Sequence, residues 1–250
     1  MSRAARVLPI VLLVAGCLVA PPAGAAEGLF LTWNDCALAP GSAHDYQQPC
    51  TSNAGSQELF CAFRMPADRD SVLGVEIEVD IQHADATMPD WWRFDVAGCR
   101  AGSLQAGFTF PPASPCVDFF PAIPGGGLQG YTLNQPHGGP NQASIIVTAQ
   151  WLTDLGYARL DSLNLYFAAG LAISNTLSTG AEACAGCLDP ACLVLNSIHV
   201  IRQPGTGDVV LTAPGPDNAN WATWQGGTGA NCSAVPVRTV TWGRLKGLYR

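Results

Sequence analysis

The sequence predicts an all-β protein, an antiparallel β-sandwich or jelly-roll-like single domain with long loops tied by disulfides. In its clearest segments, apolar and polar residues alternate with a period of two, which is typical of half-buried strands. Glycine and proline are frequent, with 27 and 19 copies in 250 residues, and they cluster between the apolar segments as turn residues do. No segment carries the apolar stripe of an amphipathic helix over three turns.

About eleven segments have this strand-like character. The expected strands are 29–33, 59–65, 75–82, 91–96, 104–110, 144–149, 162–167, 193–201, 208–212, 221–224 and 237–242. In the clearest one, 75–82, four aliphatic residues alternate with Glu76, Glu78, Asp80 and Gln82. We expect these acidic residues to form a solvated face, and a glycosidase pair of carboxylates is the less favoured alternative. The Gly- and Pro-rich tracts 111–115, 121–130 and 136–140 are expected to be loops.

Residues 1–25 have the layout of a signal peptide. A basic start precedes an apolar segment that ends at Ala20, and the residues up to Ala25 form a small-x-small cleavage site. We therefore expect cleavage after Ala25, export from the cytoplasm, and one domain over 26–250. The residues up to Cys17 also resemble a lipoprotein signal, in which Cys17 is lipidated and anchors the chain. No later apolar segment is long enough for a transmembrane helix.

The charge balance limits the partners. Charged residues make up 12% of the chain, and the formal net charge is −7. Proteins that bind nucleic acid need lysine and arginine to neutralise phosphates, so a nucleic-acid partner is not expected. A glycan or a surface protein is compatible with this composition.

Nine cysteines follow the signal segment, and an odd number leaves one unpaired in an oxidising compartment. The expected free thiol is Cys61, because it lies inside the apolar segment 59–65, where a thiol packs as a small hydrophobe. The expected disulfide framework consists of Cys36, Cys50, Cys99, Cys116, Cys184, Cys187, Cys192 and Cys232. Their connectivity stays open among 105 pairings. Our preferred pairs join sequence neighbours, Cys36 with Cys50 and Cys99 with Cys116, so that the last four cysteines share two bonds.

The segment 184–192 has two further interpretations. A zinc site would use Cys184, Cys187, Cys192 and Cys232, but structural zinc favours two Cys-x-x-Cys units and only one is present. A redox-active Cys-x-x-Cys would begin a helix, whereas Pro190 and a strand follow here. The disulfide loop is therefore favoured, and no metal is expected at these cysteines.

Several motifs together resemble a known family. They are Trp33-Asn-Asp-Cys36 near the mature start, Pro89-Asp-Trp91-Trp92 before Cys99, Cys116-Val-Asp118, the segment Cys184–Cys192, Thr223-Trp224-Gln-Gly-Gly227, and Thr241-Trp242-Gly-Arg-Leu-Lys246-Gly-Leu-Tyr249-Arg250. In this order they resemble secreted, cysteine-rich bacterial proteins that are called hypothetical proteins. The resemblance covers the whole mature chain and implies one secreted, all-β domain, with Cys61 outside the family pattern. It implies no activity and no catalytic residue.

Two kinds of ligand site are weighed. Tryptophan rings stack on sugars, and the candidates are Trp91, Trp92, Trp221 and Trp224, although packing in the core is the favoured interpretation. Acidic residues in neighbouring loops, Asp68, Asp70, Asp85 and Asp90, are a candidate Ca²⁺ site without the spacing of an EF-hand. No other cofactor is expected. We expect a non-catalytic extracellular module for binding, adhesion or structure, and the alternative is a secreted carbohydrate-active enzyme or carbohydrate-binding protein.

Overall fold

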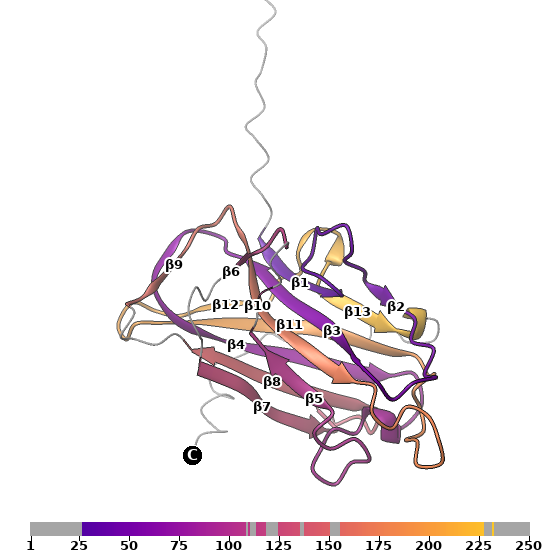
Figure 1. Ribbon diagram of the computed structural model, residues 1–250. Coiled ribbons are helices and arrows are strands. Elements are labelled where there is room, and N and C mark those ends of the chain that lie inside the picture. The colour runs from indigo at the N-terminus through magenta and orange to yellow at the C-terminus, as the bar shows by residue number, and fades with distance from the viewer. Residues whose placement is uncertain are drawn as a thin grey trace, which may run out of the picture.

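The computed structural model describes residues 27–108, 110, 114–118, 125–135, 138–150, 156–227 and 232. Within these residues the chain is built from strands in two sheets that pack on one another, which confirms the predicted all-β sandwich (Figure 1). The predicted signal segment with Cys17, the predicted strand 237–242 and the C-terminal motif 241–250 lie outside the described residues.

The smaller sheet has the order β1-β3-β10-β5, with β6 also paired to β10. Its strands are β1 (Gly28–Trp33), β3 (Ser56–Arg64), β10 (Leu165–Ser174), β5 (Leu104–Gly107) and β6 (Val117–Asp118). All pairs are antiparallel except β6 with β10.

The larger sheet has the order β2-β13-β11-β4-β8-β7, with β12 paired to β11 and β9 paired to β4. Its strands are β2 (Asp45–Tyr46), β13 (Trp221–Trp224), β11 (Ala191–Arg202), β4 (Arg69–His83), β8 (Gln142–Gln150), β7 (Gly125–Leu133), β12 (Val209–Leu211) and β9 (Ala158–Leu160). Short 3-10 helices are η1 (Asp90–Trp92), η3 (Pro216–Asn218) and η4 (Gln225–Gly227). The indigo strand β1 and the yellow strand β13 lie at the same side of the molecule (Figure 1).

One core lies between the sheets. The period-two alternation of β4 turns Ile77 and Ile81 inward, and β3 contributes Leu59, Cys61 and Phe63 from the other side. The smaller sheet is apolar on its outer face too, where a second buried cluster gathers. That cluster consists of Phe30, Cys36, Ala37, Phe60, Ala62, Cys116, Leu165, Phe167 and Ala219.

Two expected elements differ from the structure. The segment 91–96 is not a strand, because Trp91 and Trp92 belong to η1 and the chain then enters turns. The tract 121–130 is not all loop, since its described residues from Gly125 onward form β7 at the edge of the larger sheet. Glycine has a low propensity for strands. The register of β7 with β8 also shifts between Leu128 and Gly130, as it does at a β-bulge. Backbone pairing with β8 outweighs the low strand propensity of the glycines.

Four disulfides join the eight cysteines expected to pair, and Cys61 is free and buried. The bonds are Cys36–Cys116, Cys50–Cys187, Cys99–Cys184 and Cys192–Cys232, at separations of 80, 137, 85 and 40 residues. The preferred pairs Cys36–Cys50 and Cys99–Cys116 are wrong, because the fold brings together loops that are distant in sequence. The zinc and redox interpretations of 184–192 are wrong as well, since each of its cysteines is bonded to a different distant segment.

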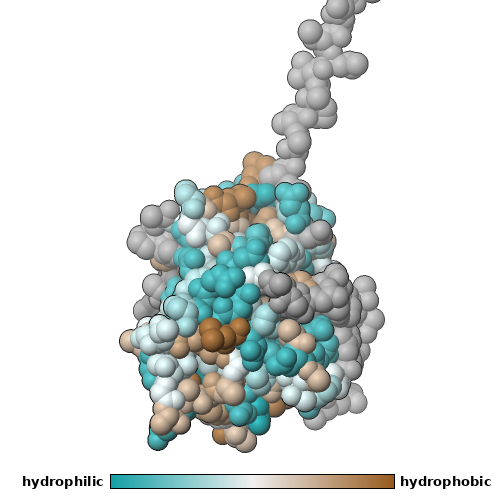
Figure 2. Space-filling view, turned by 90° about the vertical axis from the view of Figure 1, so that its right-hand side faces the viewer, coloured by the Kyte–Doolittle hydropathy of each residue, from teal (hydrophilic) through white to brown (hydrophobic). Residues whose placement is uncertain are grey.

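Figure 2 shows one face on which hydrophilic residues form a broad band and strongly hydrophobic residues appear as separate spots. Large exposed apolar side chains are scattered over the chain: Leu38, Val96, Val117, Tyr157, Leu163, Leu188 and Val210. None of the helices in the described part of the chain has the length and apolar character that crossing a membrane requires.

Candidate functional site

The outer face of the larger sheet carries a group of polar side chains that we call the polar face. Alternation places them there, because their neighbours in β4, β8 and β11 point into the core. Its members are Glu76, Glu78, Asp80 and Gln82 of β4, Gln142, Ser144 and Thr148 of β8, and Asn196, Ser197 and His199 of β11. The strands run side by side, so these residues form rows across the sheet.

The centre of the polar face is buried. Asp80 is 0% exposed and lies opposite Ser144 on β8 and Val194 on β11. The register of β11 shifts between Leu195 and Ser197, and the extra residue, Asn196, donates a hydrogen bond from its amide to the Asp80 carboxylate. The expectation of a solvated acidic face is therefore wrong at Asp80. Glu76 and Glu78, which precede Asp80 in β4, are half-buried.

Asn196 was not among the predicted site residues, although the sequence carries a signal for it. Leu193 and Leu195 are apolar at odd positions, whereas Ile198 and Val200 continue the pattern at even positions. A strand changes phase in this way where one extra residue enters a β-bulge. The bulge turns a polar amide toward the same face as Asp80.

Two further hydrogen bonds extend the polar face. The Ser144 hydroxyl donates to Glu78 over 3.4 Å. His199 Nε2 lies 3.2 Å from a carboxylate oxygen of Asp208, and the other oxygen of Asp208 accepts the backbone N–H of Arg202 at 2.9 Å. The acid that pairs with His199 thus comes from the loop before β12, nine residues away, and is held in place by the end of β11.

Trp221 lies at the rim of the polar face. It is opposite Val194, in the row that continues to Asp80, and its side chain is half-buried. The centroid of the His44 ring lies 5.4 Å from the centroid of the indole, and His44 Nδ1 is 2.7 Å from the Trp221 carbonyl oxygen. One candidate stacking residue of the four therefore has surface that a ligand can reach.

The other three candidates are not available for stacking. Trp91, Trp92 and Trp224 are each 0% exposed, and their rings contact one another with centroids 4.7 to 5.7 Å apart. Trp91 and Trp92 lie in η1 and not in the expected strand 91–96, and both rings pack into the core. They form part of the core, as the favoured interpretation held.

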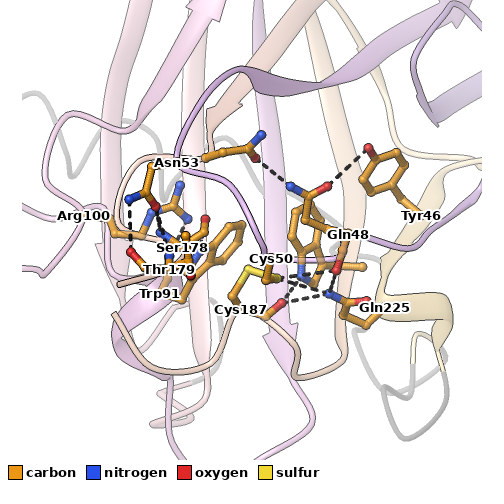
Figure 3. Close-up of a disulfide and its surroundings, with 12 residues drawn as sticks. Tyr46, Gln48, Cys50, Asn53, Trp91, Arg100, Ser178, Thr179, Cys187 and Gln225 are labelled. Atoms are coloured by element: carbon orange, nitrogen blue, oxygen red, sulfur yellow. Dashed lines mark hydrogen bonds between the residues drawn. A yellow bond between two sulfur atoms is a disulfide. The ribbon is translucent and has the colours of Figure 1, made fainter. Parts of the chain in front are cut away.

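The Cys50–Cys187 disulfide joins the segment before β3 to the loop that ends at Cys192, next to Trp224. Figure 3 shows Gln225 beside the disulfide, where its amide donates to the carbonyl oxygens of Gln48 and Cys187 at 2.8 and 2.9 Å. The Trp224 indole N–H also donates to the Cys187 carbonyl, at 2.7 Å. These bonds occupy the groups around the disulfide, so this region is structural.

Arg100 is a buried cation that the sequence analysis did not identify. Its side chain is 0% exposed and donates to the carbonyl oxygens of Trp91, Ser174 and Thr176, while its guanidinium lies 3.7 Å from the centre of the Trp91 ring (Figure 3). Burial lowers the pKa of Arg100 to about 9, and the side chain is charged at neutral pH. Arginine is mostly exposed in proteins, so composition gave no signal for this role.

The four aspartates of the candidate Ca²⁺ site do not come together. Asp68 and Asp70 lie at the beginning of β4, where both pair with Arg159 at 3.2 and 3.6 Å. Asp85 and Asp90 follow the opposite end of the same 15-residue strand. The Ca²⁺ prediction is therefore wrong, because the strand separates the two pairs by its own length.

A scan against protein-family models found no match, and searches of curated proteins and of solved structures found none either. Function is therefore inferred from the residues and their geometry.

Proposed function

We propose that this chain is an exported, disulfide-stabilised, non-catalytic binding module that acts outside the cytoplasm. Four disulfides fit an oxidising compartment, because thiols in the cytosol are kept reduced. The signal-peptide pattern of residues 1–25 and the resemblance to secreted bacterial proteins point the same way.

The proposed ligand is a carbohydrate that lies on the polar face beside Trp221. Sugars present hydroxyl groups, which need both donors and acceptors, and flat C–H faces, which pack on aromatic rings. Glu76 and Glu78 supply half-buried acceptors, Thr148 on β8 supplies a hydroxyl, and Trp221 supplies the ring. The observation that carries the proposal is the half-buried Trp221 ring, which lies on the same face of the sheet as the half-buried side chains of Glu76, Glu78 and Thr148.

Affinity electrophoresis through gels that contain soluble polysaccharides tests this ligand. Migration of the wild-type protein should be retarded by at least one polysaccharide, and Trp221→Ala should weaken binding about tenfold, a loss of about 1.4 kcal/mol. Tyr157→Ala removes another exposed aromatic side chain, just before β9, and should leave binding unchanged. Equal retardation of Trp221→Ala and wild type would exclude this face.

A hydrolase assay on the same polysaccharides separates binding from catalysis. We expect no release of reducing sugar. Release that disappears in Glu76→Gln or Glu78→Gln would replace the binding module with the carbohydrate-active enzyme of the alternative hypothesis.

Export is tested separately, by the intact mass of the protein recovered outside the cytoplasm. A start at Ala26 without added mass supports the signal peptide. A start at Cys17 with the mass of acyl chains would instead support the lipid anchor, and retention of residues 1–25 in the cytoplasm would contradict export.

A further inference from the structure

His83, Asp85 and Asp189 form a cluster at the end of β4, on a different part of the molecule from the polar face. His83 is the last residue of β4, Asp85 follows two residues later, and Asp189 comes from the loop between Cys187 and Cys192. One imidazole nitrogen and one oxygen of each carboxylate all lie within 4.8 Å of one another. These are three groups that bind metal ions in proteins.

His83 is oriented toward the two carboxylates and away from solvent. Its side chain is 0% exposed, and its Nδ1 atom is 3.7 Å from an Asp85 carboxylate oxygen and 3.1 Å from the Asp85 backbone N–H group. Its Nε2 atom is buried and has no hydrogen-bond partner among the described residues. Nδ1 is thus the acceptor that faces the cluster, and a metal at this position would take the place of one backbone hydrogen bond.

Nδ1 of His83 accepts the backbone N–H of Asp85 and so carries no proton, which is the form of this nitrogen that binds metal. Within the described part of the chain, no lysine or arginine lies within salt-bridge distance of Asp85 or Asp189. The two negative charges near the ring are thus not neutralised by a basic side chain there.

The loop that carries Asp189 is firmly attached. The disulfides at Cys184, Cys187 and Cys192 fix it to three distant segments. The carbonyl oxygen of Pro190 accepts a hydrogen bond from the N–H of Ala84 at 3.0 Å. Ala84 lies between His83 and Asp85, so this bond ties the loop directly to the β4 side of the cluster. A site with this support needs little rearrangement to bind an ion.

Gly186 lets the loop approach η1 closely. It has a φ of 102°, and a Cβ atom added there would lie 2.5 Å from Pro89. Only glycine fits both the left-handed backbone and the contact with Pro89. The position of Asp189 relative to His83 therefore depends on backbone packing and on covalent bonds, and not on a mobile loop.

We propose that His83, Asp85 and Asp189 bind one divalent transition-metal ion of the Zn²⁺ class, with an open coordination position toward solvent. Imidazole nitrogen together with carboxylate oxygen suits Zn²⁺, whereas Ca²⁺ and Mg²⁺ are bound by oxygen. Zn²⁺ ligands lie about 2.0–2.2 Å from the ion, so the three atoms must draw together slightly. Asp85 has the freedom to do so, because its side chain is 64% exposed. Three protein ligands leave a fourth tetrahedral position for water or for a ligand.

Isothermal titration of the untagged, oxidised protein with ZnCl₂ tests the site. We expect one Zn²⁺ per chain, and affinity at least tenfold weaker in Asp189→Asn and in Asp85→Asn. Asp90→Asn removes an exposed carboxylate five residues from Asp85 and outside the cluster, so it should bind as wild type does. Titration with CaCl₂ should show binding at least tenfold weaker than Zn²⁺.

Asp85→Asn separates loss of the site from loss of folding, because the Asp85 side chain is 64% exposed and does not pack in the core. Asp85→Asn should unfold at the same temperature as wild type without metal, and only the upward shift with Zn²⁺ should be lost. Failure of wild-type protein to bind Zn²⁺, or equal binding by Asp85→Asn, Asp189→Asn and wild type, overturns the proposal. Tighter binding of Ca²⁺ than of Zn²⁺ would overturn the assignment of the ion.

Discussion

On the outer face of the smaller sheet, the rings of Phe60 and Phe167 lie with centroids 5.7 Å apart, in the same cluster as Cys36 and Cys116. On the outer face of the larger sheet, the corresponding central position holds the carboxylate of Asp80, which is 0% exposed. Both faces are buried at their centres, yet one is apolar and the other is polar.

The two faces are stabilised by different means. Apolar side chains gain free energy in proportion to the area removed from water and need no particular partner. A buried carboxylate costs free energy unless hydrogen bonds compensate for the lost water, as Asn196 does for Asp80. The smaller sheet's outer face is therefore explained by stability alone. The polar face is closed at its centre by the hydrogen bond between Asn196 and Asp80, and the proposed ligand lies on its half-buried part, at Glu76, Glu78 and Trp221.

The largest expected effect comes from removing the covalent bond at the apolar face. The Cys36–Cys116 disulfide closes a separation of 80 residues, and its removal by Cys36→Ser with Cys116→Ser should lower the free energy of unfolding by about 4 kcal/mol. Guanidinium unfolding monitored by tryptophan fluorescence measures this loss. A loss below about 1 kcal/mol would show that the apolar cluster holds these loops without the bond.

Phe167→Ala tests the apolar face without touching the disulfide. The side chain is 1% exposed, so its truncation should lower the free energy of unfolding by about 3–4 kcal/mol in the same assay. The matched change on the polar face is Glu76→Gln, which keeps the shape of a half-buried side chain and should cost less than about 1 kcal/mol. Similar losses in the two variants would remove the contrast between the faces.

Asn196→Ala removes the amide that donates to Asp80. The buried carboxylate then loses one of its hydrogen bonds, and we expect a loss of about 2 kcal/mol in the free energy of unfolding. Gln105→Ala, which removes an exposed amide on β5, serves as the control and should change stability by less than about 0.5 kcal/mol. If the two variants lose the same amount, Asn196 has no special role at the centre of the polar face.

The smallest effect concerns Cys61 on the inner face of β3. Burial raises the pKa of its thiol to about 12, from an ordinary value near 9. Between these values the unfolded chain releases the proton and the folded chain keeps it, so stability falls as pH rises. From pH 9 to 10, wild type should lose about 1 kcal/mol more than Cys61→Ala. Equal pH slopes for the two proteins would mean that the thiol ionises in the folded state.

The sequence was sufficient for features that depend on local patterns. Alternation in 75–82 predicts β4 and its inward face, and the odd number of cysteines together with the apolar surroundings of Cys61 predicts which one is free. The disulfide partners depend instead on which loops two sheets bring together, and no local pattern records that. Arg100 was missed for a related reason, because its carbonyl partners belong to η1 and to the end of β10.

Only part of the two candidate sites could be predicted from the sequence. The change of apolar phase between Leu195 and Ile198 indicates the bulge that places Asn196. The approach of Asp189 to His83 has no such signal, since 105 residues separate the two and disulfides to other segments hold the loop. Export, the carbohydrate ligand and the resemblance to secreted bacterial proteins stay predictions.

The segment 184–192 has a consequence for how the protein reaches its native state. Its three cysteines are close neighbours in the chain, yet each is bonded to a partner 40 to 137 residues away. Short loops close at lower entropic cost than long ones, so oxidation of the unfolded chain favours Cys184 with Cys187 before any native pair. Such early bonds must be broken and exchanged as the sheets assemble. Recovery of the protein in quantity will therefore depend on a disulfide isomerase, or on a redox buffer that allows exchange, more than on the strength of the oxidant.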